Sequence, residues 1–222
     1  MIKRMFINRK QAGILLAKEL KQYQNKTDTI VVTIPRGGVP VGFEISKALN
    51  LPLEIVLSKK IGHPFNKEYA IGAVTLKSSV LSEAAEEVSH EYIEDETGRI
   101  RDLLQQRYDW YYGKKKPLEL TDKTVIIVDD GIATGNTLLS SIQLIEQEEP
   151  KEIVIALPVA PPSALKKIRE LRAVTQVICI LETRNFRAVG QFYEQFNQVS
   201  DKEVITLLKK ANNQLPLKTI KD

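Results

Sequence analysis

The sequence predicts an α/β fold built around a parallel β-sheet. Short β-rich runs that are almost wholly apolar recur along the chain, and continuous rather than alternating apolar runs are typical of strands covered on both faces. Segments with helical spacing lie between several of these runs, which favours parallel strands joined by helical crossovers. The predicted strands are 29–34, 53–57, 124–128, 152–157 and 176–180, and the predicted helices between them are 38–49, 136–147 and 162–172.

Two further segments complete the predicted organisation. Residues 8–23 carry apolar residues at helical spacing after Asn8, a candidate N-cap, and predict an opening helix. Residues 58–123 are too long for a plain crossover and predict a hairpin followed by one long helix at about 85–112. We therefore expect a single domain over 1–222, with a core at about 8–181, an insertion at 58–123 and a C-terminal part at about 182–222.

Composition limits the class of protein without fixing its function. The 222 residues are 43% apolar and 27% charged, enough to bury one proper core, and the net charge of +4 suits an anionic small molecule or a nucleic acid about equally. The single cysteine, Cys179, permits no internal disulfide and favours a reducing compartment. We see neither the apolar stretch of a signal peptide nor the roughly 20 apolar residues of a membrane span, so we expect a cytoplasmic protein.

Residues 125–137, VIIVDDGIATGNT, carry the clearest chemical signal. A buried strand leads into a loop of small and hydroxyl residues that opens a helix at about Asn136. Small residues let backbone amides approach a phosphate, hydroxyl groups add donors, and a helix N-terminus supplies partial positive charge. The predicted contacts to a phosphate monoester are Gly131, Ile132, Ala133, Thr134, Gly135, Asn136 and Thr137.

Asp129 and Asp130 stand between this strand and the loop. Two carboxylates at a strand end need donors, and a ribose diol offers two hydroxyl groups. Acids beside a phosphate loop therefore suggest a ribose 5-phosphate ligand, and the alternative is a strand-to-helix turn whose Asp and Thr side chains merely cap the helix. The sequence contains neither GxxxxGK[ST] nor GxGxxG, so the common nucleotide-binding loops are unsupported.

The string VIIVDDGIATGNT closely resembles the signature of type I phosphoribosyltransferases that binds 5-phosphoribosyl 1-pyrophosphate (PRPP), although many members carry an aliphatic residue at the position of Gly131. The resemblance covers residues 6–200, over which the chain is similar to an uncharacterised bacterial branch of the family. It implies the Rossmann-like fold of that family. It makes IPRGGVP (34–40) the pyrophosphate loop, where Arg36 suits a diphosphate and Gly37 and Gly38 permit close approach. The alternative there is a simple glycine-rich turn with an exposed arginine.

The same resemblance implies less specific expectations for the rest of the chain. A lid would lie within 58–70, where Lys59 and Lys60 could meet the pyrophosphate, and Mg²⁺ would be bound mainly by the ligand. The C-terminal part would form a small hood, in which Phe186, Phe192 and Tyr193 could stack on an acceptor or simply pack against the sheet. A homodimer is also implied.

These expectations favour one function over two others. The leading hypothesis is transfer of the phosphoribosyl group from PRPP to a nucleobase or related nitrogen acceptor. A PRPP-sensing regulator that could also bind nucleic acid is a second reading, although no nucleic-acid-binding motif is present. The third is an accessory enzyme that acts on another phosphosugar.

Overall fold

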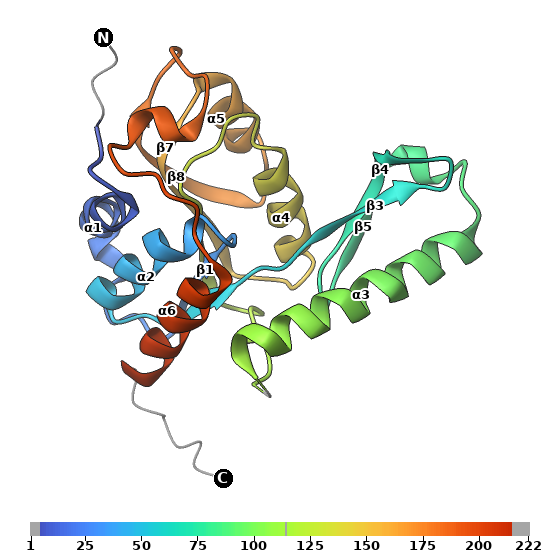
Figure 1. Ribbon diagram of the computed structural model, residues 1–222, viewed down its shortest axis with the longest axis horizontal. Helices are drawn as coiled ribbons and strands as arrows, with labels where there is room; N and C mark the ends of the chain where they lie inside the picture. The colour runs from blue at the N-terminus through green and yellow to red at the C-terminus, as the bar shows by residue number, and fades with distance from the viewer. Residues whose placement is uncertain (1–4, 114, 215–222) are drawn as a thin grey trace.

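A five-stranded parallel sheet forms the centre of the computed structural model, which describes residues 5–113 and 115–214 (Figure 1). The strand order is β2-β1-β6-β7-β8. The strands are β1 (Thr29–Thr33), β2 (Leu53–Ile55), β6 (Thr124–Val128), β7 (Glu152–Ala160) and β8 (Val174–Glu182). All five predicted strands are confirmed, and β7 and β8 are longer than the sequence suggested.

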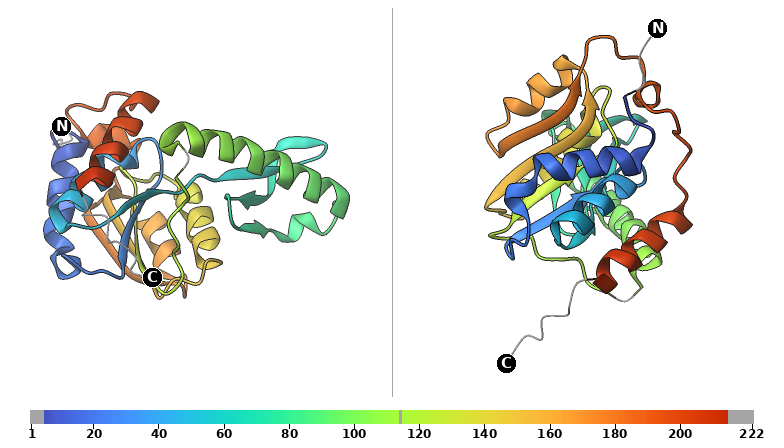
Figure 2. Two further views of the ribbon diagram at one scale, coloured as in Figure 1. Left: turned by 90° about the horizontal axis from the view of Figure 1, so that it is seen from below. Right: turned by 90° about the vertical axis from the view of Figure 1, so that its left-hand side faces the viewer.

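Helices cover both faces of this sheet, as Figures 1 and 2 show. Successive strand residues point to opposite sides, so that Val31 joins one hydrophobic cluster and Val32 the other. The continuous apolar runs follow from this double coverage. The first cluster includes residues of α1 (Arg9–Glu19), α2 (Gly38–Leu49) and α6 (Asp201–Gln214), and the second includes residues of α4 (Asn136–Glu146) and α5 (Pro162–Arg169).

The insertion forms an arm that extends away from the sheet (Figures 1 and 2). It contains an antiparallel sheet of β3 (Lys59–His63), β4 (Asn66–Val74) and β5 (Ser79–Leu81), followed by α3 (His90–Tyr112). The predicted hairpin, AIGAVTL followed by VLS, is confirmed as β4 and β5. The long helix is confirmed too, but α3 begins five residues later than predicted because Ser89 caps it, accepting a hydrogen bond from the Tyr92 amide.

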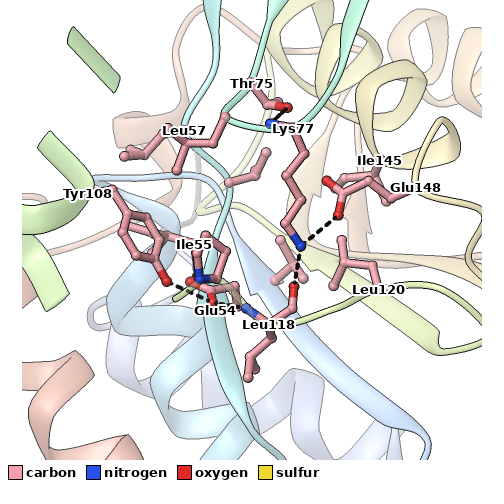
Figure 3. Close-up of a pocket in the computed structure, with 14 residues that line it drawn as sticks. Glu54, Ile55, Leu57, Thr75, Lys77, Tyr108, Leu118, Leu120, Ile145 and Glu148 are labelled. Atoms are coloured by element: carbon pink, nitrogen blue, oxygen red, sulfur yellow. Dashed lines mark hydrogen bonds and ion pairs between the residues drawn. The ribbon is translucent and has the colours of Figure 1, made fainter. Parts of the chain in front are cut away.

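A buried polar cluster anchors the base of this arm (Figure 3). The Glu54 carboxylate on β2 accepts hydrogen bonds from the Leu118 amide (2.9 Å) and the Tyr108 hydroxyl (3.2 Å). Lys77 Nζ donates to the Leu118 carbonyl (3.2 Å) and lies 3.6 Å from the carboxylate of Glu148, just after α4. Burial raises the pKa of Glu54 above its ordinary value. The cavity among these groups is about 40 Å³, which suits a structural junction better than a substrate site.

The opening helix and the remaining helices agree with the sequence. Asn8 caps α1 by accepting a hydrogen bond from the Gln11 amide (3.0 Å), as predicted. α1 ends at Glu19, and a short 3₁₀ turn follows at Lys21–Tyr23. Within the described part of the chain, no helix is both long enough and apolar enough to cross a bilayer.

Candidate active site

The two loops that the sequence singled out lie side by side. β1 and β6 are neighbouring parallel strands, so their carboxyl ends meet at one edge of the sheet. The Ile34 amide, just after β1, donates to the Val128 carbonyl at the end of β6 (3.0 Å). Ligands of open parallel sheets bind at this edge. The structure therefore brings residues 36–38 and 129–137 into one candidate site.

The loop after β6 surrounds a hollow of about 150 Å³, lined by Asp129 and residues 131–138. α4 begins at Asn136 and directs its N-terminal partial positive charge toward this end of the loop. Gly135 has a φ of 78°, which glycine adopts without strain. Ile132 differs from its neighbours, because its side chain is buried and its amide donates to the Val159 carbonyl (3.2 Å). The other predicted residues leave a concave, phosphate-sized surface.

Asp130 is buried and already paired. Its Oδ2 accepts a hydrogen bond from Arg9 Nε (2.7 Å), with each side chain 12% exposed. Its backbone carbonyl accepts one from the Tyr193 hydroxyl (2.7 Å). Burial raises the pKa of Asp130, and Arg9 opposes that rise. Burial raises the pKa of Asp129 too, and the charge of Asp130 adds to the effect. The pair is thus costly to keep ionised without a partner.

Arg9 is a site residue that the sequence did not reveal. It is the first residue of α1, and besides Asp130 it donates from Nη1 to the Asn197 carbonyl (2.7 Å). Its guanidinium also lies 3.8 Å from the centre of the Phe196 ring. The start of α1 and the segment before α6 therefore meet at the acid pair.

The loop after β1 packs directly against the acids. An added Cβ at Gly37 would fall 2.2 Å from Asp130 Oδ2, and one at Gly38 would fall 2.7 Å from the Val128 carbonyl oxygen. Both glycines are thus needed for the turn to approach β6, a reason the sequence did not suggest. The Gly38 amide donates to the Ile34 carbonyl (3.0 Å), so this amide serves the turn itself rather than a diphosphate. Arg36 lies at the rim of the candidate site, and its side chain is 35% exposed.

Comparison with known proteins settles the family. Residues 7–197 match the family model described as phosphoribosyl transferase domain. The chain belongs to this phosphoribosyltransferase family. The predicted resemblance and the predicted α/β fold are both confirmed.

Relatives agree with this assignment over most of the chain. Two proteins from strains of Mycobacterium tuberculosis, each named "Putative phosphoribosyl transferase", are 34% identical over 213 residues, which is 94% of this chain and 47% of theirs. The chain thus spans about half the length of those relatives. The crystal structure of TT1426 from Thermus thermophilus superposes with a TM-score of 0.80 at 35% identity, covering 93% of this chain and 98% of that one. A uracil phosphoribosyltransferase from Mycoplasma genitalium is 38% identical over 60 residues, 27% of this chain and 29% of its own.

Lys59 and Lys60 lie in a strand rather than in a loop. They begin β3, and the region expected to hold the lid, 58–70, is largely the β3–β4 hairpin of the arm. Lys60 Nζ is paired with Glu68 Oε2 across the hairpin (2.8 Å), and Lys59 is exposed. A catalytic role for either lysine stays a prediction.

The aromatic residues predicted to meet an acceptor are mostly part of the core. Phe192 and Tyr193 are 2% and 1% exposed and pack with Phe6, whose amide donates to the Phe192 carbonyl (3.0 Å). The prediction that these two rings stack on an acceptor is therefore wrong, because they close the contact between the N-terminal and C-terminal segments. Phe186 is half-buried, with its ring centre 5.1 Å from that of Phe192.

The acid pair is the chain's candidate contribution to a Mg²⁺ site. Across residues 5–113 and 115–214, no group of three or more His, Cys, Asp or Glu side chains converges on one point. Asp129 and Asp130 supply the carboxylate oxygens that Mg²⁺ prefers, and this ion commonly takes its other ligands from phosphates and water. The residues present fit an ion that takes most of its ligands from the phosphate groups of a bound molecule and from water.

Proposed function

We propose that this chain transfers the 5-phosphoribosyl group of PRPP to a nitrogen acceptor and releases pyrophosphate. The observation that carries the proposal is the meeting of three features at the adjacent carboxyl ends of β1 and β6. These are the phosphate-sized hollow at 131–138, the acid pair Asp129 and Asp130, and the turn of Arg36, Gly37 and Gly38 after β1. Their order along the site matches the order of groups in PRPP, which is 5-phosphate, ribose and diphosphate.

The hollow and the acids would fix the sugar. The 5-phosphate sits against the N-terminus of α4, where backbone amides and the hydroxyl groups of Thr134 and Thr137 donate to its oxygens. The ribose hydroxyl groups donate to Asp129 and Asp130, which replaces the water that burial has removed from these carboxylates. The Arg9 guanidinium favours the ionised form of Asp130, in which the carboxylate can accept both a guanidinium and a hydroxyl donor.

The chemistry requires stabilisation of charge rather than a covalent nucleophile. As the C1–O bond to the diphosphate breaks, positive charge develops at the ribose ring and negative charge on the leaving group. The carboxylates lie on the ribose side and the Arg36 guanidinium on the diphosphate side, and a guanidinium binds phosphate oxygens with a fork of donors. Mg²⁺, when bound with the ligand, would supply further neutralisation of the diphosphate.

The acceptor is a nucleobase or a related nitrogen compound. The 60-residue similarity to a uracil phosphoribosyltransferase supports placing uracil in the first set of candidates. We further propose that the β3–β4 hairpin acts as a lid that excludes water, since water would otherwise hydrolyse the donor. The free thiol of Cys179 supports the reducing cytoplasm as its compartment.

The test is pyrophosphate release from PRPP and Mg²⁺ across purines, pyrimidines and small amines. Release with one acceptor, abolished in the Asp129→Asn/Asp130→Asn variant, would support the transferase. PRPP binding without turnover on any acceptor would instead favour a PRPP sensor. Equal affinity for PRPP and ribose 5-phosphate would contradict a diphosphate subsite at Arg36.

A further inference from the structure

Asp201, the first residue of α6, joins three elements beside the pyrophosphate loop. Its Oδ2 accepts a hydrogen bond from Arg36 Nη1 (3.2 Å), and its Oδ1 accepts one from the hydroxyl of Tyr111 near the end of α3. Arg107, one turn earlier in α3, lies 3.8 Å from Oδ1 and also donates to the Tyr111 hydroxyl (3.2 Å). The carboxylate thus links the loop after β1 to the helix of the arm.

This carboxylate is held firmly in place. Val204 and Leu208, on the buried face of α6, are 0% and 1% exposed and belong to the same core cluster as the Tyr111 ring. The hydrogen bond from Tyr111, together with Arg36 and Arg107, keeps the pKa of Asp201 below its ordinary value. Asp201 is therefore a fixed anion rather than a mobile surface side chain.

The Arg36 guanidinium retains N–H donors for a ligand while it is bound to Asp201. Within the described residues, its side chain donates one hydrogen bond, from Nη1, whereas a guanidinium carries five N–H donors. We propose that Asp201 is a positioning residue that holds the Arg36 guanidinium at the pyrophosphate loop, so that its remaining donors meet the diphosphate without first being ordered. This inference rests on the proposed function, because it assigns Arg36 to the diphosphate.

Asp201 could instead oppose the diphosphate by like-charge repulsion. Two observations favour positioning. Asp201 lies between two arginines, Arg36 and Arg107, so its charge is largely compensated before the ligand arrives. Moreover, immobilising a long side chain on binding commonly weakens affinity about 2- to 10-fold, and a preformed contact avoids that loss.

The experiment measures binding of PRPP, inorganic pyrophosphate and ribose 5-phosphate, each with Mg²⁺, by titration calorimetry. Asp201→Asn keeps an oxygen that can accept from Tyr111 but places an amide against Arg36, so we expect about 3- to 10-fold weaker binding of PRPP and pyrophosphate. Ribose 5-phosphate should bind as it does to the wild type. Glu203→Gln is the matched control, because it removes an exposed acid from the same first turn of α6 and should change none of the three affinities.

A thermodynamic cycle with Arg36→Gln separates positioning from a general loss of structure. In the Arg36→Gln background, adding Asp201→Asn should weaken pyrophosphate binding no further. Additive losses, an equal loss for ribose 5-phosphate, or unchanged or tighter binding of pyrophosphate to Asp201→Asn would each overturn the inference. Failure of the wild type to bind PRPP at all would refute the proposed function instead.

Discussion

Gly37→Ala offers a sharp test of how the proposed pyrophosphate loop is built. Gly37 has a φ of −59° and a ψ of −38°, an ordinary helical conformation in which alanine carries no backbone strain. At such positions alanine usually stabilises a protein by about 0.4–1 kcal/mol. From the backbone conformation alone, Gly37→Ala would therefore be expected to stabilise the folded protein.

The contact with Asp130 reverses this expectation. The new Cβ would lie 2.2 Å from Oδ2 and 2.7 Å from Cγ of Asp130, so the carboxylate would have to retreat by about 1 Å to reach ordinary contact. It has little room, because its side chain is 12% exposed and is bound to Arg9 at 2.7 Å. Overpacking of this kind costs about 1–3 kcal/mol. After the backbone gain, we expect a net loss of about 1–2 kcal/mol, which would lower Tm by about 2–8 °C.

The assay is thermal unfolding followed by PRPP titration. Because Gly37→Ala displaces the carboxylate that we propose binds the ribose, PRPP affinity should fall more than about tenfold, the equivalent of one charge-assisted hydrogen bond. Gly98→Ala is the matched control: an added Cβ at Gly98, inside α3, would meet nothing within 4 Å. Its Tm should rise through a gain of about 0.5–1 kcal/mol, with PRPP affinity unchanged. A Gly37→Ala variant as stable as Gly98→Ala, with wild-type PRPP affinity, would refute this account of the loop.

Three further predictions follow from buried polar groups. Asp129→Asn should raise the free energy of unfolding of the empty protein by about 0.5–2 kcal/mol. Because the folded pKa of Asp129 is raised, the contribution of this group to the free energy of unfolding falls as pH rises above about 4, so the advantage of the variant should grow between pH 4 and pH 8 in denaturant titrations. Tyr193→Phe leaves the buried carbonyl of Asp130 without its donor and should cost about 1–3 kcal/mol in the same titrations, whereas no loss would indicate that water replaces the hydroxyl. Glu54→Gln places an amide against donors that now meet a carboxylate, such as the Leu118 amide, and should therefore lower Tm. A Tm equal to that of the wild type would contradict the anchoring role of this residue.

The sequence predicted the central sheet because burial on both faces leaves a continuous apolar run, as in TVIIV at 124–128. It did not predict β3, because KKIGH at 59–63 has two exposed lysines and no apolar alternation. β3 owes its extended conformation to pairing with β4, a contact that local composition does not report. The boundary of α3 was missed for a similar reason, since the acidic residues at 83–87 continue without a break in charge into the acidic first half of the helix at 91–96.

The residues of the candidate site also differ in how far the sequence could predict them. Residues 129–137 and 36–38 could be selected because each loop carries its chemistry within a few neighbouring residues. Arg9 and Asp201 could not, since each meets its partner across a long sequence separation, 121 residues for Arg9 and Asp130 and 165 for Arg36 and Asp201. Each is also the first residue of a helix, where a charged side chain is ordinary. The aromatic residues at 192–193 were predicted to be in the site but lie in the core, because stacking on a ligand and packing in a core require the same side chains.

Arg9 and Asp201 have a common physical role in the empty site. A phosphosugar site must place carboxylates and a guanidinium where the ligand will complement them, and such groups destabilise the folded protein when they have no partner. Here Asp130 is compensated by Arg9 and Arg36 by Asp201, each through a single guanidinium nitrogen of the arginine. Because both compensating residues come from segments near the two ends of the described chain, which meet through Phe6 and Tyr193, packing between these segments sets the electrostatics of the loops. A mutation that loosens the Phe6–Tyr193 contact should therefore weaken PRPP binding without touching any residue that faces the ligand.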